Sequence, residues 1–398
     1  MKVKSIFVSM LAIAALASCS RQEFVDPGIG PQEGSKMLVD ITLSNGEQTK
    51  AAGVATADDD KKINDVTVFF LNNLDQIVSK QWVEGTSLTD GADGVKTATV
   101  ETRSTATKMM VIANIGEDRT TGTLNVSTKA NLEGVVQSLI NEDTPPLPVQ
   151  VKGEVFMSGE GTVLDMTPGA DGAASTATSA VTLNFVAAKI TLSKIELGND
   201  VKGVYGDDFK FTRAFLLNVQ TNSWYFPTAN SYLPDAKAYA NGVAWETDNW
   251  GSDDPGYPVV ADFNQSLTAI ASQTDLPKTD IAHWYVFENK PTAVTDHPTI
   301  LVVEVEWRKV KAGGEIAQDE KVKKMFNVIF HSSDKGVIEA GKAYDVSLTF
   351  NGNFLPEIDG GNGGGGSETP DEPNVNANVS ITVTPADWTT ENTEKPFE

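Results

Sequence analysis

The histidines and carboxylates are the side chains of this sequence that could carry acid–base or metal chemistry. There are three histidines, His283, His297 and His331, and their spacing matches no metal-ligand motif. No nucleophile elbow or phosphate-binding loop occurs, and the 54 acidic residues single out no pair for glycoside hydrolysis. A secreted hydrolase is therefore the least favoured interpretation, and we expect no enzyme activity, no metal and no cofactor.

Acidic clusters are the remaining candidates for a metal site. They are Asp58–Asp60, Asp90 with Asp93, and Asp253 with Asp254. Such clusters usually form solvated acidic turns, and weak calcium binding is the alternative interpretation.

The single cysteine, Cys19, has a different chemistry. A short apolar run, 6–16, follows two lysines, and Leu16–Cys19 (LASC) has the small-residue form of a bacterial lipoprotein cleavage site. The apolar run is too short for a stable membrane span. We predict that residues 1–19 are the export signal of a lipoprotein, that Cys19 is the lipidated residue, and that the chain has no internal disulfide.

The aromatic residues of segment 222–278 could stack on sugar rings. They include Trp224, Tyr225, Trp245 and Trp250, and such rings pack in cores as readily as they bind sugars. Packing is the favoured interpretation. The alternative function is a monomeric surface lipoprotein that binds glycans weakly at Trp245 or Trp250.

The elements that would position these residues are mostly short strands. The 398 residues are 40% hydrophobic, enough for about two domains, and the net charge of −23 argues against nucleic-acid partners and anionic membrane surfaces. Strand-like runs separated by turn residues predict two antiparallel β-sandwiches in tandem. We also expect one helix over 132–140, a strand over 149–157 and a loop over 168–179.

A strand near the carboxyl end is set apart from this body. It is preceded by a Gly-rich and acidic segment, 357–373, which is typical of a flexible linker. A lone amphipathic strand is unstable in water, so it must complete some sheet. Its apolar residues alternate strictly with polar ones: Val375, Ala377, Val379, Ile381 and Val383.

A rival strand lies near the amino end. Its apolar residues are Met37, Val39, Ile41 and Leu43, and a polar loop containing Lys50 follows it. Such a loop is a natural site for proteolysis. We predict that a cut between Lys50 and Ala51 releases this strand and that the carboxyl strand of a neighbouring subunit replaces it. Pilins complete each other's sheets in this way.

The sequence resembles the fimbrillins of the FimA/Mfa-like type, lipoprotein-derived pilins also called type V, over nearly its whole length. The resemblance is carried by the lipobox Leu16–Cys19, KKINDVTVFF (Lys61–Phe70), VFMSGE (Val155–Glu160), WYVFENKP (Trp284–Pro291) and the final PADW (Pro385–Trp388).

The resemblance implies two transthyretin-like β-sandwich domains with one or two short helices, and no enzyme activity. It further implies a shaft subunit, since tip subunits of that family lack a carboxyl-terminal strand that follows a flexible linker. The family's cut commonly follows an arginine, so Lys50 calls for a trypsin-like or lysine-specific protease. The expected partners are other copies of the chain, related fimbrial subunits, the protease and a transient lipid anchor in the outer membrane, with the mature form extracellular in the fimbria.

These inferences define six segments and one outcome that would contradict them. If both terminal strands lay side by side in one molecule, each in its own position, they could not be interchangeable. The segments are the signal 1–19, a propeptide 20–50, an N-terminal sandwich 51–187, a C-terminal sandwich 188–356, the linker 357–373 and a donor strand 374–398 that includes Trp388.

Overall fold

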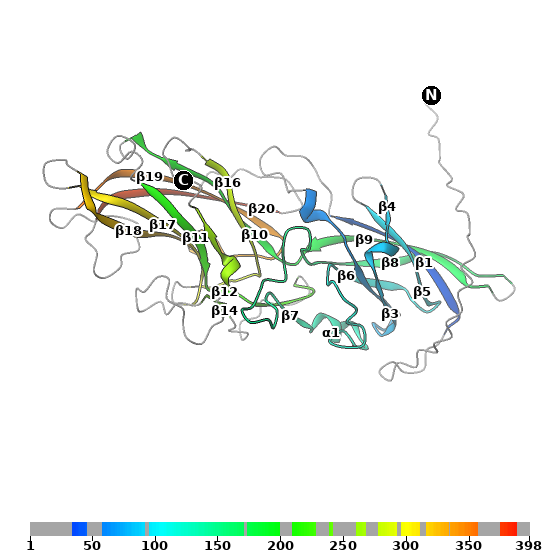
Figure 1. Ribbon diagram of the computed structural model, residues 1–398. Coiled ribbons are helices and arrows are strands. Elements are labelled where there is room, and N and C mark those ends of the chain that lie inside the picture. The colour runs from blue at the N-terminus through cyan, green and yellow to red at the C-terminus, as the bar shows by residue number, and fades with distance from the viewer. Residues whose placement is uncertain are drawn as a thin grey trace, which may run out of the picture.

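The fold is built almost entirely from β-strands, as the sequence predicts (Figure 1). Within the described residues, no helix is long and apolar enough to cross a membrane. The computed structural model describes residues 34–45, 58–91, 95–170, 173–199, 209–227, 239–241, 260–267, 278–292, 296–310, 316–333, 335–356 and 375–387.

The first half of the chain forms one curled eight-stranded sheet. Strand β8 pairs with β6 along its first part and with β9 near both of its ends, so the sheet folds over at β8 and encloses a core. The strand order is β3 (Ile77–Val83), β2 (Val66–Leu71), β6 (Lys108–Ala113), β8 (Met157–Thr167), β9 (Ser175–Phe185), β1 (Lys36–Asn45), β5 (Lys96–Arg103) and β4 (Thr89–Asp90).

The second half forms two four-stranded sheets that pack face to face. Phe350 of β19 lies 5.1 Å from Phe211 of β11 and 5.0 Å from Phe326 of β18, measured between ring centroids. These edge-to-face contacts join the two sheets. One sheet has the order β16 (Lys278–Val286), β10 (Ala188–Leu197), β19 (Lys342–Pro356) and β20 (Val375–Asp387), and the other β15 (Asn264–Ser266), β11 (Lys210–Leu217), β17 (Thr299–Val310) and β18 (Ile316–Phe330).

One continuous apolar core includes side chains of both halves, whose ribbons adjoin each other in Figure 1. The short strand β7 (Val136–Ser138) of the first half pairs with β13 (Asn222–Trp224) of the second, and β12 (Val219–Gln220) pairs with β14 (Tyr239–Ala240). β9 ends at Phe185 and β10 begins at Ala188. The domain boundary at 187/188 falls in this connection and remains a prediction.

Strand β2 shows why an uninterrupted apolar run forms a strand here. All six of its residues, VTVFFL, are buried. Val68 and Phe70 face the main core, whereas Phe69 and Leu71 face a second cluster that contains Leu132 of α1 (Lys129–Glu133). A strand covered on both faces has no solvent side, so alternation is lost.

Three expectations were wrong in detail. The helix expected over 132–140 is α1, a single short element that Thr128 caps through Asn131 N and that ends before Gly134; β7 follows immediately. The loop expected over 168–179 is shorter, because β9 already begins at Ser175. No strand forms over 149–156, where the side chain of Gln150 accepts a hydrogen bond from Phe156 N and closes a turn.

Candidate functional site

Strand β1 occupies a central position in the first sheet. It runs antiparallel to β5, with Lys36–Leu43 opposite Lys96–Arg103, and parallel to β9, with Met37–Asn45 opposite Ser175–Leu183. Both edges of its backbone are therefore paired. Removing β1 would leave a gap between two strands that do not otherwise neighbour each other.

The inward face of β1 is completely buried. Met37, Val39 and Leu43 are 0% exposed and Ile41 is 1% exposed. The four side chains belong to the main core. The period-2 interpretation of this segment is thus confirmed as a strand with these residues inside.

Two polar contacts on the outward face of β1 lie at the surface. Thr99 Oγ1 donates a hydrogen bond of 2.6 Å to Asp40 Oδ1, and Lys36 pairs with Glu101 at 2.6 Å between two exposed side chains. Exposed pairs of this kind contribute about 1 kcal/mol or less. The apolar face and the two ladders therefore hold the strand.

Strand β20 lies at the edge of the second-half sheet and pairs antiparallel with β19 of its own chain. Its register places Val383 opposite Val346 and Ile381 opposite Leu348. Val383 is 5% exposed and Ile381 is partly buried, whereas Ser380 and Thr382 between them are exposed. The segment is therefore an amphipathic strand, and these two apolar residues face the core.

The position of β20 corrects the picture of a tail separated from its own body. In this molecule β1 and β20 each have a position, as the monomeric alternative requires of the carboxyl strand. They are not side by side, because β1 belongs to the first sheet and β20 to the second-half sheet. One strand is central and the other is an edge strand, so the two positions are not equivalent.

The two halves share one pattern of strand directions, which explains where β20 sits. β8, β9, β1 and β5 are related in turn by antiparallel, parallel and antiparallel pairings. β20, β19, β10 and β16 repeat that sequence of pairings. β10 is thus the counterpart of β1, and β20 takes the position that β8 holds in the first half.

A buried ion pair joins the halves, and its Asp60 follows the predicted cleavage loop in the sequence. Asp60, in the short helical turn Asp58–Lys61, is 0% exposed, and its carboxylate lies 2.6 Å from Lys189 Nζ of β10. Tyr285 of β16 donates a hydrogen bond to the same carboxylate. The expectation of a solvated acidic turn is therefore wrong for Asp60, because a cation on the other half compensates its burial.

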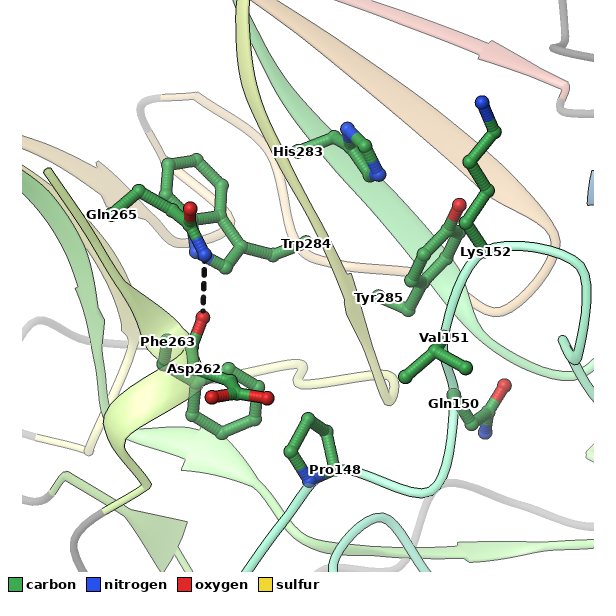
Figure 2. A pocket seen from close by; sticks show the side chains of 10 residues that line it. All are labelled: Pro148, Gln150, Val151, Lys152, Asp262, Phe263, Gln265, His283, Trp284 and Tyr285. Atoms are coloured by element: carbon green, nitrogen blue, oxygen red, sulfur yellow. Dashed lines mark hydrogen bonds between the residues drawn. The ribbon is translucent and has the colours of Figure 1, made fainter. Parts of the chain in front are cut away.

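A small cavity of about 160 Å³ lies at the same junction (Figure 2). His283 of β16 lies at its rim, and burial together with the positive charges of Lys189 and Lys152 lowers the pKa of its imidazole. Trp284 Nε1 and Gln150 Nε2 find no acceptor among the described residues, but both atoms are shielded and a ligand in the cavity would not reach them. We assign no ligand to this cavity. The lining side chains come from the loop at Pro148, Gln150, Val151 and Lys152, from Asp262, Phe263 and Gln265 around β15, and from His283, Trp284 and Tyr285.

The other chemical candidates are structural where the structure describes them. His297 stacks on Tyr239 with ring centroids 5.0 Å apart, and His331 Nδ1 lies 2.9 Å from Ser333 Oγ. Asp90 is exposed and pairs with Lys96. In the described part of the chain, no three metal-ligating side chains come together.

The aromatic segment is described only in pieces. Tyr225 and Phe226 are 1% and 3% exposed and pack in the second core cluster, in line with the packing interpretation. Trp245 and Trp250, the candidate glycan contacts, lie outside the described residues, as do Cys19, Lys50, Ala51 and Trp388.

The first part of β9, one of the two strands that flank β1, was not found from the sequence. The buried residues in the first part of β9 are Ser175, Ala177 and Ser179. Because these residues are small and weakly apolar, the alternation becomes recognisable only at Val181 and Leu183. Scoring serine and alanine as buried-compatible residues would extend the period-2 pattern back to Ser175.

Comparison with known proteins adds independent information. Residues 187–388 match the family described as FimA-like major fimbrial subunit protein, C-terminal domain, and residues 37–200 match the family described as major fimbrial subunit protein (FimA). No curated protein matches the chain.

Solved structures show the same fold. A candidate cell adhesion protein from Bacteroides eggerthii is 24% identical with a TM-score of 0.65, and the similarity covers 92% of this chain and 100% of that one. A second candidate cell adhesion protein, from Parabacteroides distasonis, is 16% identical with a TM-score of 0.56 over 89% and 99% of the two chains. A fimbrilin, FimA of Porphyromonas gingivalis, is 18% identical with a TM-score of 0.53 over 90% and 99%. Since the FimA-like profile alone matches more than half of the residues, the chain belongs to the FimA-like major fimbrial subunit family and is a structural subunit of a cell-surface fimbria.

Proposed function

We propose that this subunit forms a fimbrial shaft by protease-triggered donor-strand exchange. The observation that carries the proposal is the central position of β1 between β5 and β9. A cut between Lys50 and Ala51 separates β1 from every later strand of the sheet. The strand can then leave without unthreading the fold, and its departure opens a groove that a strand of another subunit fills.

The inward face of β1 sets the strength of the contact. Burial of four side chains of the size of Met37, Val39, Ile41 and Leu43 contributes about 6–12 kcal/mol as an upper estimate. Each ladder hydrogen bond adds about 0.5–1.5 kcal/mol. The donor residues that would supply this burial are Val375, Ala377, Val379, Ile381 and Val383, followed by Trp388.

The tail must leave its own β19 to act as a donor. In its own subunit β20 pairs only with β19. In the groove that β1 vacates, it would pair with both β5 and β9 and bury its apolar face between two layers. The residues between β19 and β20 could span about 60 Å when extended. The exchange therefore increases both pairing and burial, and the tail is long enough to reach a neighbour.

The uncut chain is protected from this reaction. β1 fills its groove with similar burial and is covalently attached, so a competing strand gains nothing until proteolysis removes the resident one. Because the contact joins one subunit's tail to another's groove, it is heterologous and propagates into a filament.

The same proposal includes the route to the surface. Residues 1–19 direct export, Cys19 is lipidated, and the precursor is held in the outer membrane until the cut at Lys50 frees it into the fimbria. A trypsin-like or lysine-specific protease and neighbouring fimbrial subunits are the partners of this route.

Limited proteolysis tests the proposal. Cleavage after Lys50 should convert monomer into a ladder that resists mild denaturation, and filaments sheared from cells should begin at Ala51. The variant Lys50→Gln, treated identically, should stay monomeric. Deleting Asn374–Glu398 should leave a cleaved but monomeric protein; a ladder from this truncated chain would show that the tail is not the donor.

The observation that β20 folds onto its own β19 favours the second candidate, a monomeric glycan-binding lipoprotein. In that case the cut protein stays monomeric and a glycan panel changes its tryptophan fluorescence. Ladder formation together with fluorescence that no glycan alters would exclude it.

A further inference from the structure

The two terminal strands share a short sequence. Residues 39–44 read VDITLS and residues 379–384 read VSITVT. Val39 corresponds to Val379, Ile41 to Ile381 and Thr42 to Thr382, and the remaining pairs include Leu with Val and Ser with Thr. Period-2 alternation alone would require only apolar residues at every second position, so identity at these three positions is additional information.

The matched residues also have matched faces in the structure. Ile41 is buried and Thr42 is exposed in β1, and Ile381 is partly buried while Thr382 is exposed in β20. The alignment therefore matches inward-facing residues of β1 with inward-facing residues of β20, and outward-facing residues with outward-facing ones.

Resting on the proposed exchange, we propose that the β20 of a second copy of this chain enters the groove in this one register and in the direction of β1. Ser380 then takes the place of Asp40, between Thr99 of β5 and Thr178 of β9. The donor runs antiparallel to β5 and parallel to β9, and Val379 and Ile381 fill the centre of the groove.

A shift of two residues in one direction is opposed by Pro385. It would bring Pro385 to the position of Leu43, which is paired with Lys96 on one side and Val181 on the other. Proline has no backbone N–H for a ladder and is confined to strand ends and edges. In the proposed register Pro385 falls at the position of Asn45, the last residue of β1, where the pairing with β5 has ended and only that with Leu183 of β9 remains.

The opposite shift of two residues leaves a void in the centre. It would put Ala377 in the place of Val39, a residue that is 0% exposed. In the proposed register Ala377 replaces Met37 instead, which is also 0% exposed but lies at the first pairing of β1 with β9. A void in the middle of a closely packed core cannot be relieved as easily as one at a strand end.

The outward face favours the same register. Thr99 Oγ1 donates to Asp40 in the precursor, and the Ser380 hydroxyl can accept that hydrogen bond in its place. The side chains of Asp40 and Thr99 are exposed, so a pair introduced there does not disturb the core.

Cysteine pairs across the groove measure the register. All variants carry Cys19→Ser, are cleaved after Lys50 and are oxidised as ladders form. Thr99→Cys is combined in turn with Asn378→Cys, Ser380→Cys or Thr382→Cys, which the proposed register puts on the outward face. Directly opposite residues fall within the Cα separation of a disulfide, whereas diagonal neighbours about 7–8 Å apart do not. We expect at least about tenfold more cross-linked dimer from the Ser380→Cys pair than from either shifted pair.

The direction needs a second pair. Thr97 lies opposite Thr42, so Thr97→Cys with Thr382→Cys should also cross-link. In a reversed donor centred on the same residue, Thr382 would instead face Glu101.

The outcomes separate the register from the exchange itself. Ladders that cross-link through Asn378→Cys or Thr382→Cys with Thr99→Cys overturn the register and leave the exchange standing. Ladders without a cross-link from any pair place the tail elsewhere and overturn both. No ladder from the cleaved parent protein overturns the exchange, and with it the register.

Discussion

β1 and β20 have nearly the same apolar pattern but very different surroundings. β1 is paired on both edges and its inward side chains are at most 1% exposed. β20 is paired on one edge, with Val383 5% exposed and Ile381 partly buried. The strands that pair with a strand, and not its own apolar pattern, therefore decide how deeply it is buried and how many ladders hold it.

The counterpart relation between the halves sharpens this difference. In the first half, the strand beside β9 is β8, which pairs with a strand on each side. In the second half, the strand beside β19 is β20, the last strand of the described chain, and it pairs on one side only. An edge strand can leave by breaking one ladder. A central strand must break two, which supports the proposal that β1 leaves only after proteolysis.

Locking β20 in place should produce the largest effect. In Thr349→Cys with Ser380→Cys, the two residues are directly opposite on β19 and β20, so a disulfide should form within the molecule. We expect the oxidised, cleaved protein to give no ladder and the reduced protein to give a normal one, measured by non-boiled electrophoresis. Thr349→Cys alone is the control; a ladder from the oxidised double variant would show that β20 need not leave.

A charge on each strand tests the difference in stability. Ile41→Asp should cost at least about 4 kcal/mol of unfolding free energy in the precursor, because the carboxylate is buried without a partner. Ile381→Asp should cost only about 1–2 kcal/mol, because the edge strand can detach. Urea denaturation compares the two, and equal costs would contradict the comparison. The ladder of cleaved Ile381→Asp should be lost.

The buried pair between the halves gives a smaller effect that should leave both strand positions intact. Asp60→Asn removes the charge facing Lys189 and should cost about 3 kcal/mol. Glu101→Gln, which breaks the exposed pair with Lys36, should cost about 1 kcal/mol or less. Thermal melting measures both. Cleaved Asp60→Asn should still form ladders below its melting temperature; if it does not, the junction and the groove are coupled.

Acidification should give the smallest effect and should distinguish two buried carboxyls, Asp65 and Glu304. Burial raises the pKa of Asp65 in the first half despite hydrogen bonds from Trp82, Gly116 and Ile115. For Glu304 of β17, burial acts in the same direction, but a hydrogen bond from Thr212 and the charges of Arg213 and Lys323 prevail and lower its pKa below 4.5.

The two shifts have opposite consequences. The stability from Glu304 is present above pH 4.5 and is lost as the pH falls through its lowered folded pKa. The contribution of Asp65 is most favourable below pH 3.8 and is lost as the pH rises through its raised folded pKa. Acid should therefore remove the stability that Glu304 contributes and relieve the cost of the Asp65 charge.

Glu304→Gln measures this effect. It should cost about 1.5–3 kcal/mol at pH 7, because a charge-assisted hydrogen bond is lost, and the difference from the parent protein should vanish as the pH falls through the pKa of Glu304. Glu306→Gln, which affects a more exposed pair with Lys321, is the matched control. A pH-independent difference between Glu304→Gln and the parent would contradict the assignment of the shift.

Several features were predictable because they depend on neighbours along the chain. Alternation over Met37–Leu43 and over Val375–Val383 predicted two strands with the correct inward residues, as far as the structure describes them. The mainly β fold followed from many such runs with turn residues between them.

Tertiary structure alone decided what each strand pairs with. A period-2 pattern specifies which face of a strand is buried but not which sheet covers it, so it could not tell the central position of β1 from the edge position of β20. Asp60 was read as solvated because its compensating cation, Lys189, is remote in the sequence, and the helix expected to Ile140 stops at Glu133 because β7 pairs with β13 from the other half. Strand pairing, the burial of Asp60 and the end of α1 depend on contacts between residues far apart in the sequence, so local residue patterns could not predict them.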